Sequence, residues 1–299
     1  MAMRNLPGVN LCCGLVLAAV SLPGCGQPRV AAPVADLAAV ERLRGVLGSA
    51  ATAAADSATE AAPTGTGWAT LKGRFIFTGT PGEPQPLKGV AEKNVCSKDG
   101  KDLVDRSLLV DPATKGLANV VIFARKTSRV KEAATAARLT FDQKHCEFIS
   151  PVFAARVGQP VDIRNSDPIG HNTNIEGTSF NQLIPAGSGA AYAPEVEFGM
   201  PKKITCNIHP WMKAYGIFRK DGYVSVSAAD GSFQIPDLPA GETIELQVWH
   251  ERAKSAGNVL GLQKPELKWT PKGRFQVRLE ADEVKDLGTI EVPGTAVGD

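Results

Sequence analysis

From about residue 67 onward, the chain consists of short runs in which apolar and polar residues alternate, separated by Gly, Pro, Asp and Asn. Successive side chains of a strand point to opposite faces of a sheet, so this alternation predicts strands with one buried face. No helical pattern longer than a few turns is convincing in this region. The best predicted strands of its first part are TLKGRFIFTG (70–79), ANVVIFA (118–124), VGQPVDIRN (157–165), EVEF (195–198) and KKITC (202–206). The expected fold class is all-β, built as a sandwich.

A second series of strands fills the last third of the chain: YVSVSA, SFQI, TIELQVWH, RFQVRL and GTIEV. A length of 299 residues, 43% of them apolar, is enough for two cores. We therefore expect one domain over 68–220 and a smaller β-sandwich over 221–299. Alternatively, the strands at 70–79 and 118–124 belong to the second sandwich, and the first domain is inserted between the strands of that sandwich.

The N-terminus has the pattern of an export signal: a basic residue, Arg4, then an apolar run over 11–20, then small residues. The apolar run is too short to span a bilayer. The sequence LPGC, which ends at Cys25, resembles the lipobox of bacterial lipoproteins. This resemblance implies that the signal (1–24) is removed and that an acylated Cys25 anchors the protein to a lipid membrane outside the cytoplasm. Gly26, rather than Asp, favours the outer membrane. An ordinary secreted protein is the alternative.

The segment over 25–67 is rich in Ala, Thr, Ser and Pro and has few large apolar residues. It cannot bury enough surface to form a core, so we expect a disordered tether. The formal net charge of the chain is only +2, from 33 basic and 31 acidic residues. Such a balanced chain offers no basic field to a polyanion, which excludes nucleic acid as a partner.

Export also determines how the six cysteines are used. Two lie inside the signal and Cys25 takes the lipid, which leaves Cys96, Cys146 and Cys206. In an oxidising compartment a pair of cysteines usually forms a disulfide, and a remaining one needs another explanation. If Cys206 binds a metal, Cys96 and Cys146 are left as a disulfide. Two buried free thiols are the alternative.

The motif CNIHPWM (206–212) brings a thiol, an imidazole and a thioether together in seven residues. Cysteine thiolate, histidine and a weak axial methionine are donors of a mononuclear copper electron-transfer site, which needs one more histidine. A candidate occurs upstream in NSDPIGHNTNI, where His171 lies in a Pro and Gly turn after a predicted strand.

These segments resemble a known family. VGQPVDIRNSD, GHN and CNIHPWM are similar to the strand and the two ligand loops of cupredoxins, with the Cys-x-x-His-Pro-aromatic-Met spacing of amicyanin. The resemblance covers about 139–219. It implies a Greek-key sandwich with one type 1 (blue) copper ion, bound by His171, Cys206, His209 and, weakly, Met212.

The same resemblance assigns roles to the neighbours of the ligands. Asn172 is expected to donate its backbone N–H to the Cys206 sulfur. Ile208 stands where amicyanin has a proline, so a second N–H group becomes available to that sulfur. Pro210 and Trp211 are expected to form an apolar patch around a surface edge of the second imidazole, where redox partners dock. Trp211 packed in the core is the alternative.

Other uses of the Cys206 motif fit less well. A structural zinc site needs four strong ligands, and Met is a poor one. Haem attachment needs Cys-x-x-Cys-His, which the sequence lacks. A Cys–His nucleophile needs a third, orienting group, and a multicopper oxidase needs more than the four histidines present. A cluster without a metal also remains open.

In the last third, ADGSFQI and LPAGETIELQV resemble the transthyretin-like, carboxypeptidase-regulatory-like class of β-sandwich, which indicates fold and says little about function. The remaining histidines, His145 and His250, are expected at the surface. The predicted function is a non-catalytic electron carrier whose partners are a redox donor and a redox acceptor protein. The alternative is an extracytoplasmic binding or scaffold lipoprotein with a copper-holding domain that passes no electrons.

Overall fold

The computed structural model describes residues 65–132 and 137–298. Within these ranges the regular structure consists of sixteen strands and two 3₁₀ turns. The predicted all-β fold class is confirmed. No helix among the described residues is long and apolar enough to cross a membrane. The predicted signal, the lipidation site Cys25 and most of the tether lie outside the described residues.

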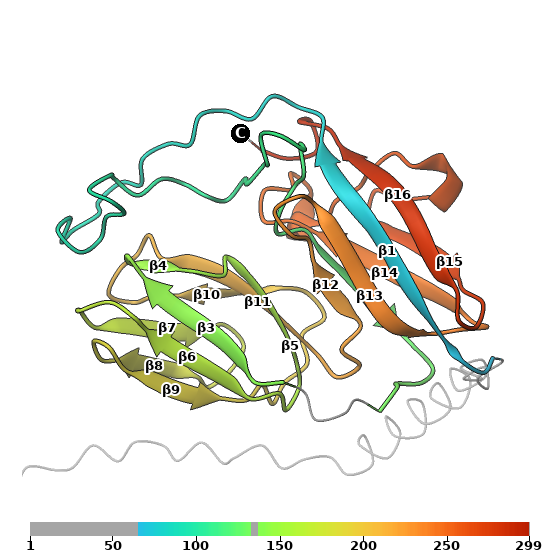
Figure 1. Cartoon of the computed structure of the whole chain (residues 1–299), viewed down its shortest axis with the longest axis horizontal. Helices are drawn as coiled ribbons and strands as arrows, with labels where there is room; N and C mark the ends of the chain where they lie inside the picture. Colours follow the sequence, from blue (N-terminus) through green and yellow to red (C-terminus); the bar gives the residue numbers. More distant parts are fainter. Residues whose placement is uncertain (1–64, 133–136, 299) are drawn as a thin grey trace, which may run out of the picture. The chain divides into compact units, whose positions relative to one another are not determined.

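The first β-sandwich consists of two sheets drawn in green to yellow in Figure 1. One sheet has the order β5-β11-β10-β7-β8, with bounds Val152–Arg156, Lys213–Arg219, Lys202–Thr205, His171–Ile175 and Asn181–Ile184. The other has the order β4-β3-β6-β9, with bounds Glu147–Phe148, Leu139–Lys144, Val161–Asn165 and Gly189–Tyr192. Buried apolar side chains from both sheets form one core, which includes the stacked rings of Phe141 and Phe148.

The second β-sandwich takes strands from both ends of the described chain (Figure 1). One sheet has the order β13-β1-β16, with bounds Ser232–Pro239, Trp68–Phe77 and Val284–Val292. The other has the order β12-β2-β14-β15, with bounds Val224–Val226, Val121–Lys126, Thr243–Trp249 and Arg274–Arg278. Buried and exposed residues alternate along the first part of β13, so one face of this strand packs into a separate core, whereas the last four residues of β14 are all buried.

This strand pairing differs from the expected domain boundaries. β1 and β2, which we placed in the domain over 68–220, pair with strands that follow residue 220. The first sandwich is therefore inserted between β2 and β12, as in the alternative arrangement. The physical reason is that β1 fits between two C-terminal strands, antiparallel to β13 and parallel to β16, and buries Leu71 and Phe75 in their core.

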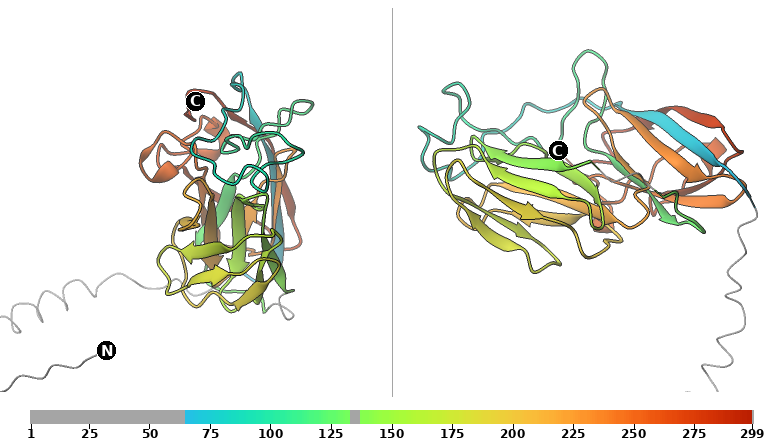
Figure 2. Two further views of the ribbon diagram at one scale, coloured as in Figure 1. Left: turned by 90° about the vertical axis from the view of Figure 1, so that its left-hand side faces the viewer. Right: turned by 60° about the horizontal axis from the view of Figure 1, so that its bottom comes forward.

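The connection from β1 to β2 is long and mostly irregular, and residues 84–107 of it, here called the strap, reach the first sandwich (Figures 1 and 2). Its buried residues Cys96 and Leu103 belong to the core of that sandwich. A disulfide joins Cys96 to Cys146 in the turn between β3 and β4. The strap is thus a connection between two strands of the second sandwich that also packs on one end of the first.

His250 follows β14 and is fully buried, whereas we expected it at the surface. Its Nδ1 accepts a hydrogen bond from the backbone N–H of Arg252 at 3.2 Å. Burial lowers the pKa of His250 to about 4, because the charged imidazolium would lose its hydration. The sequence ELQVWH did not predict this burial, because the pattern of apolar and polar residues is the same whether the final histidine is buried and neutral or exposed.

The pKa of His250 predicts a pH-dependent stability. Between about pH 6.5 and 4 the unfolded chain binds a proton at this residue and the folded chain does not, so the free energy of unfolding falls as pH falls. The expected loss is up to roughly 3 kcal/mol. Urea unfolding at several pH values measures it, and His250→Asn should flatten the slope. His145→Asn, at a half-buried turn residue, is the control; an equal flattening there would contradict the prediction.

Candidate metal centre

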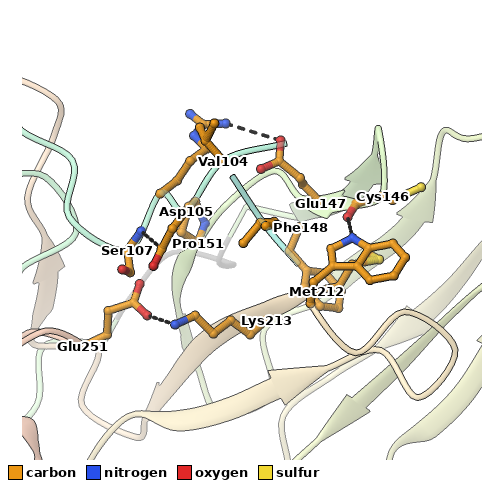
Figure 3. Close-up of a pocket in the computed structure, with 13 residues that line it drawn as sticks. Val104, Asp105, Ser107, Cys146, Glu147, Phe148, Pro151, Met212, Lys213 and Glu251 are labelled. Carbon is orange, nitrogen blue, oxygen red and sulfur yellow. Dashed lines mark hydrogen bonds and ion pairs between the residues drawn. The ribbon is translucent and has the colours of Figure 1, made fainter. Parts of the chain in front are cut away.

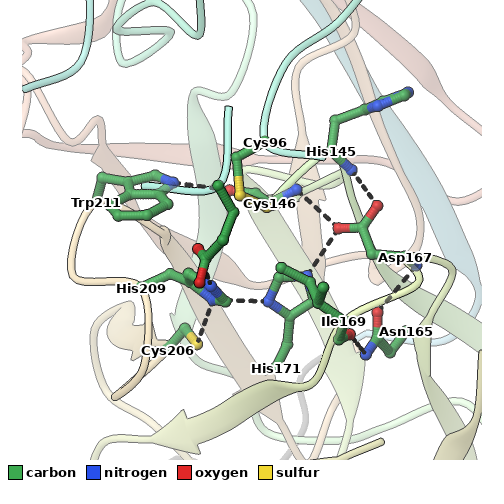
Figure 4. The surroundings of a disulfide bond; sticks show 11 residues. Cys96, His145, Cys146, Asn165, Asp167, Ile169, His171, Cys206, His209 and Trp211 are labelled. Atoms are coloured by element: carbon green, nitrogen blue, oxygen red, sulfur yellow. Dashed lines mark hydrogen bonds and ion pairs between the residues drawn. A yellow bond between two sulfur atoms is a disulfide. The ribbon is translucent and has the colours of Figure 1, made fainter. Parts of the chain in front are cut away.

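Three metal-binding side chains converge at one end of the first sandwich (Figure 4). His171 begins β7, Cys206 directly follows β10, and His209 lies in the next turn. The two Nδ1 atoms are 2.9 Å apart, and the Cys206 sulfur is 3.6 Å from Nδ1 of His209. The ligand atoms of all three residues lie within 4.8 Å of one another, and all three side chains are buried. The structure therefore brings together the three strong ligands that the sequence indicated.

The loop over 206–212 is closed by its own backbone. The N–H of Cys206 donates to the carbonyl of Met212, and the N–H of Met212 donates to the carbonyl of His209. These bonds bring Met212 back beside the start of the loop, where it is 1% exposed and belongs to the same apolar core as Cys206. All four predicted ligand residues thus come from β7 and this single loop.

The Cys206 sulfur lies in a setting that favours the thiolate. The backbone N–H of Asn172 donates to it at 3.2 Å, as the sequence predicted for this residue. Burial raises the pKa of the Cys206 thiol, but hydrogen bonds from His171 and from the backbone N–H groups of Asn172, His209 and Ile208 outweigh burial and lower the pKa to about 6. The backbone N–H of Ile208 therefore helps to lower the pKa of Cys206, whereas a proline at this position would have no N–H to donate.

Asp167 completes the site and was missed from the sequence. Its Oδ2 is 2.7 Å from Nε2 of His171, and its side chain is 4% exposed. Burial lowers the pKa of His171, but the Asp167 carboxylate and the Cys206 sulfur outweigh this and raise it to about 9. Both neighbours therefore favour the charged form of the His171 ring. A four-residue Asp-to-His spacing in a loop gives no periodic signal by which Asp167 could have been recognised.

His209 is covered by the strap, contrary to the expected surface edge. It is 2% exposed, and Oε2 of Glu92 in the strap lies 3.5 Å from its Nε2. The Trp211 ring is half-buried at 5.1 Å from the His209 ring, and its Nε1 donates to the carbonyl of Cys146. Only Pro210 of the expected patch is exposed. The reason is the disulfide, which holds the strap over this end of the sandwich.

A small cavity of about 60 Å³ adjoins the ligand loop (Figure 3). Its lining includes Trp211 and Met212 and is otherwise a mixture of apolar and charged side chains. Lys213 pairs with Glu251 at 2.9 Å, and Asp105 accepts a hydrogen bond from the N–H of Ser107. Met212 thus lies between the apolar core and a narrow space with a mixed lining.

The residues present fit copper better than the alternatives. A thiolate, two imidazoles and a buried methionine are the donors of a blue-copper site. Zinc would need a fourth strong ligand, and the buried carboxylate of Asp167 already accepts hydrogen bonds from His171 and from two backbone N–H groups. Cys96 and Cys146 also lie close to His209, but their sulfurs form a disulfide and offer no thiolate.

No family model and no curated protein matches the chain. Among solved structures, a reduced Cu(I) form of an amicyanin variant at pH 4 matches with 17% identity over 30% of this chain and 87% of its own, at a TM-score of 0.25. Amicyanin from Paracoccus versutus matches with 16% identity over 33% of this chain and 97% of its own, also at 0.25. Because these TM-scores are low, the function proposed below rests on the geometry of the site.

Removing the disulfide should loosen the cover over His209. Replacing Cys96 and Cys146 by Ala is expected to lower the free energy of unfolding by about 2–5 kcal/mol and to speed amide hydrogen exchange in the strap. Urea unfolding and exchange mass spectrometry measure the two effects. The control is Lys93→Met, which breaks only the exposed ion pair to Asp102 in the strap and should cost below about 1 kcal/mol. Unchanged strap exchange in the double variant would contradict the prediction.

Proposed function

We propose that the protein is a type 1 copper electron carrier, not an enzyme. The observation that carries the proposal is the buried convergence of the Cys206 sulfur with the imidazoles of His171 and His209, with a backbone N–H directed at the sulfur. Copper bound there would supply a one-electron couple, Cu(II) + e⁻ ⇌ Cu(I), with no bond made or broken in a substrate.

The chain's own residues suit this role because they are held in place before any metal binds. His171 and Cys206 are attached to paired strands, and the ligand loop is closed by backbone hydrogen bonds. The strap keeps water away from His209, which is 2% exposed. A ligand set that moves little between two oxidation states lowers the cost of gaining or losing an electron.

Substitution of the sulfur ligands tests the proposal. Cys206→Ser should abolish the intense visible thiolate-to-copper band, because that band arises from the copper–sulfur bond. Met212→Gln should keep a coloured site with a shifted potential, because the axial ligand is long and weak. Visible spectra and voltammetry of copper-loaded protein measure both. Met200→Gln, outside the ligand loop, is the control. A Cys206→Ser protein that stays intensely coloured would refute the copper assignment.

We further propose that redox partners meet the exposed face of the ligand loop. Ile208 is 49% exposed and Pro210 is exposed, whereas His209 itself is covered. An electron would then pass between the copper ion and the partner through the residues of the ligand loop, and not through a solvent-exposed edge of the His209 ring. Small contacts of this kind suit partners that must dock and separate quickly.

Electron self-exchange between two copies measures this docking without a known partner. Ile208→Lys should slow self-exchange roughly tenfold, because two added charges repel each other, and should leave the visible spectrum unchanged. Val284→Lys, at a residue of β16 that is 60% exposed, should have no effect. Equal rates for the wild type and the Ile208 variant would place docking elsewhere. A copper site with no reversible potential would favour the scaffold function.

The lipid anchor is a separate proposal, which the LPGC sequence ending at Cys25 supports. Acylated at Cys25, the carrier would remain attached to a membrane outside the cytoplasm, with the outer membrane favoured. Cys25→Ser should release the protein or leave its signal uncut, as measured by membrane fractionation and intact mass. Unchanged membrane partition of this variant would refute the anchor.

A further inference from the structure

Asp167 is a buried carboxylate that no predicted role includes. It lies in the loop between β6 and β7, four residues before His171 (Figure 4). Its Oδ1 accepts the backbone N–H of His145 at 2.7 Å, and its Oδ2 accepts the backbone N–H of Cys146 at 2.8 Å. The same Oδ2 is 2.7 Å from Nε2 of His171. Every contact of this carboxylate is therefore with a hydrogen-bond donor.

The contact with Asp167 determines which nitrogen of His171 faces the other ligands. An ionised carboxylate only accepts hydrogen bonds, so Nε2 of His171 must carry a proton. Nδ1, the other ring nitrogen, is 2.9 Å from Nδ1 of His209, which in turn lies 3.6 Å from the Cys206 sulfur. The ring is thus held with its metal-binding nitrogen toward the ligand cluster.

We propose that Asp167 is a positioning residue for the copper site, which orients His171 and places a negative charge beside the ligands that favours Cu(II) over Cu(I). This inference rests on the proposed function. Partners of this kind fix the tautomer and the ring orientation of a metal-binding histidine and increase its basicity.

The turn between β3 and β4 is shaped to hold this carboxylate. His145 and Cys146 both have left-handed backbone angles, with φ of 55° and 56°, and their successive N–H groups both reach Asp167. Cys146 is also fixed by its disulfide to Cys96. An amide side chain in place of the carboxylate would direct its own N–H₂ group at one of these donors, so the site requires an acid.

The test compares Asp167→Asn with Asp142→Asn. Asp142 is a carboxylate whose side chain bonds Ser166 and Gln143 instead of a metal ligand, so its variant removes the same charge from the same sandwich. In Asp167→Asn we expect the His171 Nε2 proton signal of the metal-free protein to be lost by NMR. We also expect Cu(II) binding to weaken about 10- to 100-fold in a chelator competition and the reduction potential to rise. Asp142→Asn should match the wild type in all three.

A third variant separates charge from position. Asp167→Glu keeps the charge and displaces the oxygens, so Cu(II) binding should weaken while the potential changes less than in Asp167→Asn. It also carries the test if Asp167→Asn does not fold.

The outcomes distinguish this inference from the function on which it rests. The role of Asp167 would be overturned if its variants bound copper with the wild-type affinity and potential, or if Asp142→Asn shifted both equally. The copper site itself would still stand in that case, as long as the wild-type protein shows the visible band. A wild-type protein that takes up copper without that band would overturn the proposed function and this inference together.

Discussion

The antiparallel pairing of β7 with β10 is the constraint on which the candidate site depends. Its register sets Ile204 against Ile175 and Thr205 against Asn174. Cys206 directly follows β10 beside this pair, and the backbone N–H of Asn172 in β7 donates to its sulfur. A one-residue slip would turn the alternate side chains to the other face of the sheet and separate His171 from the cysteine.

Beside this pair, the buried polar groups of the candidate site have partners, as the low polarity of a protein interior favours, although Oγ1 of Thr173 in β7 is buried without one. The sulfur receives backbone N–H groups, His171 meets Asp167, and Asp167 is satisfied by the turn at His145. The same rule operates where the two sandwiches join. The guanidinium of Arg219, 5% exposed at the end of β11, donates to the carbonyl of Ala124 in β2 and pairs with Asp221.

The parts of this site that could be recognised from sequence are those whose geometry is local. A cysteine, a histidine and a methionine in one seven-residue loop must lie close together, whatever the rest of the fold does. The alternation of apolar residues likewise predicts strands, because it depends on neighbours along the chain. In contrast, β1 pairs with β16, more than 200 residues later, and nothing in the alternation of either strand says which partner it takes.

Asp167 and the strap are further features that the sequence could not predict, here at the level of single residues. The carboxylate matters because a turn made of His145 and Cys146 lies beside it, and the burial of His209 depends on a segment more than 100 residues upstream. Contacts of this kind are properties of the folded chain. The burial of His250 is another case, since its environment comes from β14 and the loops that follow it.

The path of the strap bears on whether the two sandwiches are separable modules. A fragment beginning at residue 137 would contain His171 and the whole ligand loop, yet it would lack Cys96 and Glu92, and its Cys146 would have no partner. The chain that covers the metal-binding end of one sandwich is anchored on both sides in the sheets of the other, through β1 and β2. Exchange of either sandwich for a foreign domain would therefore have to preserve two connections and one disulfide, which ties changes at the candidate metal centre to the neighbouring sandwich.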